Sequence, residues 1–132
     1  MNTTLGDDGL GTAYRWWTGC PPYRQYYKRT DLTVPPPSQL WVFVDEHPDS
    51  INNGDMAVKC DATGAAAQFV DYPASYHNGA CGFSFADSHA EIKKWLDPRT
   101  KPPVTYTGTI NGRPSPNNPD VLWLQERAAG RK

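Results

Sequence analysis

The apolar run at residues 40–44 constrains the fold of this chain more than any other feature. It reads Leu-Trp-Val-Phe-Val, and an uninterrupted series of β-branched and aromatic residues is typical of a buried strand. Three consecutive prolines lead into the run, and Pro48 ends strand pairing shortly after it. A membrane-spanning helix needs roughly 20 apolar residues, far more than this run offers. We therefore expect a buried central strand here, and no membrane contact from this part of the chain.

A β-hairpin is the second pattern. Residues 82–86 alternate as a strand does, Asp87 and Ser88 supply a two-residue turn, and residues 89–96 continue as the partner strand. Residues 56–70 are expected to hold a short strand on either side of an Asp-Ala-Thr-Gly turn. These segments predict a small antiparallel sheet.

A short helix is expected over residues 120–129. Asp120 is the predicted N-cap, because a carboxylate at this place can accept a hydrogen bond from the first turn. The expected core residues are Leu122, Trp123 and Leu124, and the residues expected to face solvent are Glu126 and Arg127.

Proline and glycine indicate long loops. The 132 residues include 13 Pro and 11 Gly, but also five Trp, seven Tyr and four Phe. Disordered chains are usually poor in aromatic residues, so we expect ordered loops around a small sheet. The predicted fold class is α+β in one domain, residues 1–132. Its expected parts are an irregular aromatic-rich segment (1–38), a sheet core (39–96), a Pro/Gly-rich loop (97–119) and the helix (120–129).

The charge of the chain argues against nucleic-acid binding. The formal net charge is −1, whereas binders of nucleic acid usually carry a basic surplus. Aromatic and cationic residues do alternate near the N-terminus, which could form a stacking platform for single-stranded nucleic acid. The overall charge favours rings that cover the sheet with their cationic neighbours in water. Exposed rings would also suit a carbohydrate-binding module, an alternative that stays open. The residues concerned are Tyr14, Arg15, Trp16, Trp17, Tyr23, Arg24, Tyr26, Tyr27, Lys28 and Arg29.

Three cysteines leave the redox compartment open. Cys20, Cys60 and Cys81 allow either one disulfide and one thiol or three thiols. No C-x-x-C pair is present, so zinc-ribbon and thioredoxin-like interpretations have no support.

Histidines and carboxylates stand at the ends of the predicted strands, and we expect them at one edge of the sheet. A site of this composition would suit zinc, and with an open position it would suit a metal-dependent hydrolase. No H-E-x-x-H or G-x-S-x-G motif supports catalysis by a metal or by Ser75, Ser84 or Cys81. The simpler interpretation is a hydrogen bond from His77 to Asp87 that fixes the loop to the hairpin, with no enzymatic activity. The candidate cluster is His47, His77, Asp87 and His89, with Asp45 beside it.

A second candidate site is a calcium loop. Hard oxygen ligands are dense between residues 45 and 55, as calcium requires, although the run does not match an EF-hand. The alternative is that Asp49, Ser50 and Asn52 cap turns through backbone amides. The candidate ligands are Asp45, Glu46, Asp49, Asn52 and Asp55, with Ser50 and Asn53 between them.

Three sequence blocks resemble one bacterial family. Residues 73–89, with His77 and Asp87, resemble the H-x9-DG motif of pilin-like proteins that carry a prepilin-type N-terminal processing segment. Residues 42–54 resemble a second block of that family, and residues 120–127 resemble its common ending. Two departures stand out. Ser88 occupies the place of the motif glycine, which predicts a strained or altered turn. The family's hydrophobic N-terminal helix is also absent, so we expect a fragment or a truncated gene product.

The resemblance implies a non-catalytic assembly module. A type IV pilin-like or type II secretion pseudopilin-like protein has a small antiparallel sheet as its head, and a helix that anchors the full-length protein in the inner membrane. Its implied partners are other pilin-like subunits and the secretion or filament assembly machinery. The implied location is periplasmic or extracellular, on a cell-surface filament. Pseudopilins similar to it bind calcium in a C-terminal loop, which favours calcium as the cofactor here.

Overall fold

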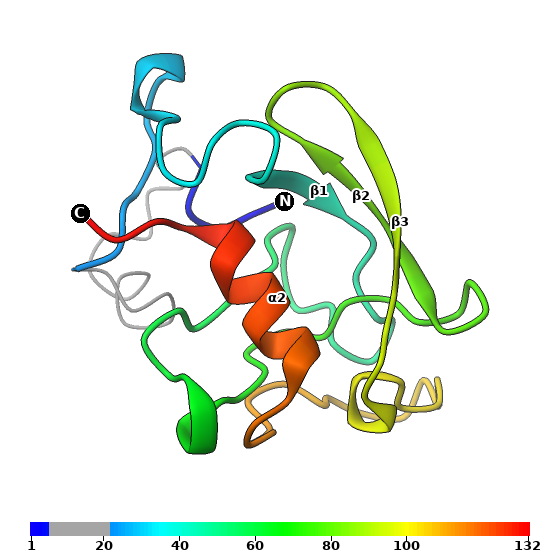
Figure 1. The fold of residues 1–132 in the computed structure, drawn as a ribbon. Coiled ribbons are helices and arrows are strands. Elements are labelled where there is room, and N and C mark those ends of the chain that lie inside the picture. The colour runs from blue at the N-terminus through cyan, green and yellow to red at the C-terminus, as the bar shows by residue number, and fades with distance from the viewer. Residues whose placement is uncertain (6–21) are drawn as a thin grey trace.

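A small α+β domain is formed by the part of the chain that the computed structural model describes, residues 1–5 and 22–132. Its antiparallel sheet has the strand order β1 (Trp41–Val44), β2 (Ala80–Phe85) and β3 (Ala90–Lys94). The helix α2 (Pro119–Ala128) lies across one face of the sheet, and long loops join the elements (Figure 1). Short 3-10 turns occur at η1 (Arg29–Asp31), η2 (Gly64–Ala66) and η3 (Pro98–Thr100). The fold class predicted from the sequence is confirmed at this level.

The strand at residues 41–44 is an edge strand, so its predicted central position is wrong. Among the strands of the described residues it pairs with β2 only, and an irregularity in register falls between Trp41 and Phe43. Trp41 is fully buried, whereas Phe43 is 58% exposed on the opposite face. The far edge of β1 receives a hydrogen bond from the N–H of Asn2 to the carbonyl of Val42. The apolar run therefore places Trp41 in the core and Phe43 on the exposed face of the sheet.

The β2–β3 hairpin is confirmed, but its predicted two-residue turn is wrong, because the loop consists of the three residues 86–88. The N–H of Ser88 donates to the carbonyl of Phe85, and the N–H of Phe85 donates to the carbonyl of His89. This pattern closes a three-residue loop in which the last residue has a left-handed backbone. That residue is Ser88, at φ 80°. The departure from the motif glycine therefore falls on a conformation that glycine adopts without strain.

The two strands predicted within residues 56–70 are not formed. Met56 makes an isolated parallel bridge with Asn2, and Gln68 makes an isolated antiparallel bridge with Pro114. The backbone of this segment bonds instead to loops and to a side chain: the N–H of Phe69 donates to the carbonyl of Arg113, and the N–H of Ala57 donates to Asp71. These bonds to loops and to a side chain take the place of a strand ladder.

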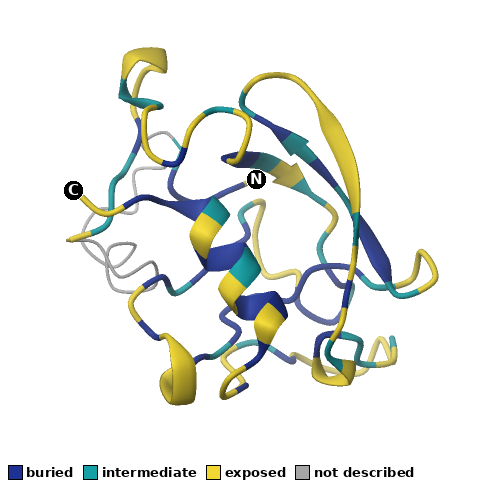
Figure 2. Ribbon diagram, in the orientation of Figure 1, coloured by how far each residue is buried: buried dark blue, intermediate teal, exposed yellow. Residues whose placement is uncertain are grey.

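The helix begins at Pro119, one residue before its predicted start. Asn118 is the N-cap, since its side-chain oxygen accepts from the N–H of Asp120 at 2.8 Å, and Pro119 fills the first helical position. Asp120 is therefore inside the first turn and not the cap. The helix buries Val121, Leu124, Gln125 and Ala128, whereas the predicted core residue Leu122 is 49% exposed. Figure 2 shows buried and exposed residues alternating along this helix.

Aromatic rings fill the space between sheet and helix. Phe83 makes edge-to-face contacts with Trp41, Trp95 and Trp123 at centroid distances of 5.9, 5.9 and 5.0 Å. Such contacts add to the free energy gained from burying the rings.

No helix among the described residues is long and apolar enough to cross a bilayer. Of the N-terminal aromatic and cationic residues, Tyr14, Arg15, Trp16 and Trp17 lie outside the described residues, as does Cys20.

Candidate functional site

One predicted pair of side chains meets where β1 ends. Nε2 of His77 lies 3.7 Å from a carboxylate oxygen of Asp45, and both side chains are more than half exposed. The backbone carbonyl of Asp45 also accepts from the N–H of Ala74 and the thiol of Cys81. The loop that carries His77 is therefore fixed to the end of β1 and not to the hairpin turn.

A second pair forms at the hairpin turn. Nδ1 of His89 lies 2.5 Å from Oδ1 of Asp87, and the imidazole stacks on the Phe85 ring at 4.3 Å with an interplanar angle of 3°. The hydrogen bond from His89 holds the pKa of the Asp87 carboxyl below its ordinary value. This pair is exposed and has a structural role in the turn.

The two pairs lie at opposite ends of β2, which corrects the expectation of a single edge. Between His77 and Asp87 the chain runs through the whole of β2, and each strand residue adds about 3.4 Å. β1 runs antiparallel to β2, so Asp45 falls beside the start of β2, near His77. The hydrogen bond expected between His77 and Asp87 is therefore wrong.

His47, the third histidine, is fully buried and already bonded at both nitrogens. Nδ1 accepts from the N–H of Asp49 at 3.2 Å, and Nε2 lies 3.1 Å from the carbonyl of Pro102. A carbonyl only accepts, so Nε2 carries the proton and the ring is a neutral tautomer. His47 connects the end of β1 to the loop after η3. Within residues 1–5 and 22–132, no three His, Cys, Asp or Glu side chains group as metal ligands would.

The acidic residues between 45 and 55 have separate roles. The Asp49 carboxylate accepts from the N–H and the hydroxyl of Thr105 at 2.7 and 3.1 Å, and the N–H bond above all lowers the pKa of Asp49. Oγ of Ser50 accepts from the N–H of Tyr72, and Oδ1 of Asn53 accepts from the N–H of Asp55. Asn52 is exposed. Calcium binding by this segment stays a prediction, and a calcium titration of the melting temperature tests it.

Glu46 and Asp71 are two carboxyl groups with raised pKa values, which the sequence did not predict. Burial, and then the nearby charge of Asp71, raise the pKa of Glu46 to about 7. Burial also raises the pKa of Asp71, although its carboxylate accepts from the N–H of Ala57 and the amide of Asn111. Oε1 of Glu46 is buried without a hydrogen-bond partner in the described part of the chain. The signal in the sequence was an Asp enclosed by Val70 and Tyr72.

The candidate nucleophiles are held in structural contacts. The thiol of Cys81 is buried and donates to the carbonyl of Asp45 at 3.3 Å, and burial raises its pKa to about 12. A thiol with so high a pKa is a poor source of thiolate. Oγ of Ser84 accepts from the N–H of Phe43 at 3.2 Å.

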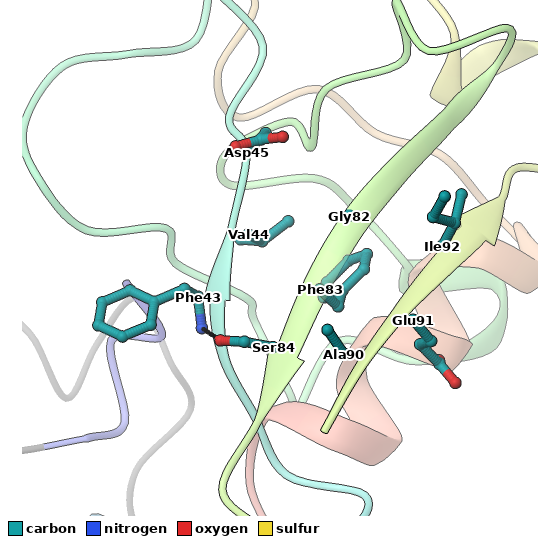
Figure 3. A pocket seen from close by; sticks show the side chains of 9 residues that line it. All are labelled: Phe43, Val44, Asp45, Gly82, Phe83, Ser84, Ala90, Glu91 and Ile92. Carbon is teal, nitrogen blue, oxygen red and sulfur yellow. Dashed lines mark hydrogen bonds between the residues drawn. The ribbon is translucent and has the colours of Figure 1, made fainter. Parts of the chain in front are cut away.

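A shallow groove of about 660 Å³ crosses the face of the sheet opposite the helix (Figure 3). Gly82 and Ser84 form its floor on β2, with Phe43 on β1 at one margin and Ile92 on β3 at the other. Ile92 is 79% exposed. The groove is apolar and has few hydrogen-bonding groups, so it suits packing better than chemistry.

Comparison with known proteins gives no relative. No family model, no curated protein and no solved structure matches this chain.

Proposed function

We propose that this chain is the head domain of a pilin-like protein of the H-x9-DG family. It works without catalysis, as a subunit of a type IV pilin-like or type II secretion pseudopilin-like filament. The three sequence blocks that resemble the family contact one another in the fold, and this observation carries the proposal. Asp45 of the block at residues 42–54 meets His77 of the block at residues 73–89, and β1 pairs with β2. Trp123 of the block at residues 120–127 makes an edge-to-face contact with Phe83 of the block at residues 73–89, at a centroid distance of 5.0 Å.

The hairpin turn supports the same proposal. Ser88, at the place of the motif glycine, has a positive φ, a conformation that makes glycine the preferred residue. A motif that joins a histidine before β2 to a turn after β2 would fix both ends of this strand. The motif then serves the fold of the head domain, in keeping with a subunit whose activity is assembly.

Antibodies against the purified chain test the proposal in cells of the source organism. We expect the antigen in the inner-membrane fraction and in filaments sheared from the surface, and we expect a prepilin segment in the gene upstream of Met1. A cytosolic marker protein controls the fractionation. Antigen found only with the cytosolic marker, in cells whose gene encodes no prepilin segment, would refute the proposal.

Elemental analysis addresses the alternative of a metal-dependent hydrolase. We expect no stoichiometric zinc in the purified protein or in the His77→Ala variant. Zinc that is bound by the wild-type protein and lost in the variant would favour the enzyme. A glycan array addresses the carbohydrate-binding alternative, for which we expect no binder.

A further inference from the structure

The outer edge of β3 carries unpaired backbone groups. In the described ranges β3 pairs with β2 alone, and Figure 1 shows it as the marginal strand of the sheet. Hydrogen-bonded pairs alternate along an antiparallel ladder. The bonds between Phe85 and His89 and between Trp95 and Gly79 fix that alternation. Ala90, Ile92 and Lys94 therefore direct their N–H and C=O groups away from β2.

We propose that this edge pairs with the same edge of a second copy of the chain, antiparallel and about a twofold axis at Ile92. This inference does not rest on the proposed function. Ala90 of each copy would face Lys94 of the other, and Ile92 would face its own counterpart. Each of these residues offers one outward N–H and one outward C=O, so the pairing forms a continuous ladder from one sheet to the other.

Charge complementarity selects this register. A twofold axis at Ile92 places Glu91 directly opposite Lys93 of the other copy, twice. Shifting the axis by one residue preserves a backbone ladder, but it places Glu91 opposite Glu91 or Lys93 opposite Lys93. Like charges directly opposite each other destabilise a sheet, and unlike charges stabilise it. The sequence of β3, Ala-Glu-Ile-Lys-Lys, is therefore complementary to itself in one register.

The faces of the joined sheets are also compatible. Glu91 and Lys93 share the helix side of the sheet, where the Lys93 ammonium lies 3.9 Å from Asp120 and above the Trp123 ring. The partner's Glu91 would approach this ammonium from its open side. On the opposite side the two Ile92 side chains, each 79% exposed, would cover each other. Pairing would thus join the outer grooves of both copies into one apolar surface (Figure 3).

Sedimentation of the purified chain across a range of concentrations tests the pairing. We expect reversible dimers, and we expect Ile92→Pro to weaken the dimer roughly tenfold or more, since both copies lose an interchain hydrogen bond. The β2–β3 ladder should survive this change because the N–H of Ile92 points away from β2. Ile51→Lys, at an exposed isoleucine away from the sheet, is the matched control and should leave the dimer unchanged. Unchanged association of Ile92→Pro would overturn the proposal.

Two further measurements keep the proposal falsifiable if a variant folds poorly. Amide exchange of the wild-type chain should show protection that rises with concentration at Ala90, Ile92 and Lys94. Concentration-dependent protection elsewhere, or no dimer at millimolar concentration, would refute it. Glu91→Lys and Lys93→Glu should each lose self-association, and a mixture of the two should regain it because opposite charges then face each other. A mixture that stays monomeric, with both variants folded, would also refute the proposal.

Discussion

The carboxylate of Asp120, in the first turn of α2, accepts a 2.8 Å hydrogen bond from the hydroxyl of Thr100. Both residues are fully buried. The same carboxylate accepts from the N–H groups of Leu96 and Asp97 at 3.0 and 2.9 Å. One side chain thus satisfies donors from the segment after β3 and from η3. It thereby ties the start of α2 to the segment after β3 and to η3.

Asp120→Ala should be strongly destabilising. The variant leaves the donors at residues 96, 97 and 100 without their partner, and an unsatisfied buried donor costs about 1–3 kcal/mol. We expect the free energy of unfolding to fall by about 2–4 kcal/mol in urea titrations. Glu126→Ala, on the exposed side of the same helix, is the control and should change it by less than about 0.5 kcal/mol. Equal effects of the two variants would contradict the assigned role of Asp120.

Glu46 should make the protein less stable as the pH rises. Its pKa is raised to about 7 in the folded state and lies near its ordinary value in the unfolded state. The folded state therefore binds more protons between these values, and the free energy of unfolding falls as the pH increases from about 4.5 to 7. Asp71 contributes in the same direction, because burial raises its pKa too.

Glu46→Gln removes the ionisation and keeps the shape of the side chain. We expect the variant to be more stable than the wild-type protein at pH 8, on the order of 1–3 kcal/mol, and about equally stable at pH 5. Thermal melts at both pH values measure the difference. Glu126→Gln controls for a carboxylate in water. A stability gain of equal size at both pH values would count against ionisation of Glu46 as the cause.

Much of the fold follows from local pattern, but the strand arrangement does not. The alternation at residues 82–86 and the turn residues after it predict the hairpin from adjacent residues alone. Whether residues 41–44 lie at the centre or the edge depends on which distant segments pair with them. The N-cap had a local signal that was missed: Pro119 at the first helical position identifies Asn118 as the cap.

Which candidate site residues meet depends on the direction and the length of the strands that carry them. Asp45, His77 and Asp87 all stand at strand ends, but the sequence alone did not show which ends coincide. A six-residue β2 between His77 and Asp87 puts them at opposite ends of the strand, and antiparallel pairing selects Asp45 as the partner of His77. The Asp71 charge that raises the pKa of Glu46 comes from a different loop, so no periodicity could have revealed it.

His47 and His77 should differ in their contribution to stability. His47 is fully buried with both nitrogens bonded, so His47→Ala leaves a cavity and an unpaired N–H at Asp49. We expect a loss of about 2–4 kcal/mol. His77→Ala removes an exposed contact of 3.7 Å, and we expect a loss below about 1 kcal/mol. Urea denaturation of both variants measures this. If His77→Ala cost as much as His47→Ala, the separate roles assigned to them would be wrong.

Ser88 should be improved by glycine. Its φ of 80° lies in the left-handed region, where a side chain introduces a clash that glycine avoids. Part of the gain is offset because glycine has more freedom in the unfolded chain, so we expect Ser88→Gly to raise the free energy of unfolding by about 0.5–1 kcal/mol. Ala86→Gly in the same loop is the matched control. Ala86 does not have a positive φ, so glycine there should lower stability by a similar amount. Thermal melts of both variants check the opposite signs, and a loss of stability in Ser88→Gly would show that the serine side chain contributes more to the turn than its backbone strain costs.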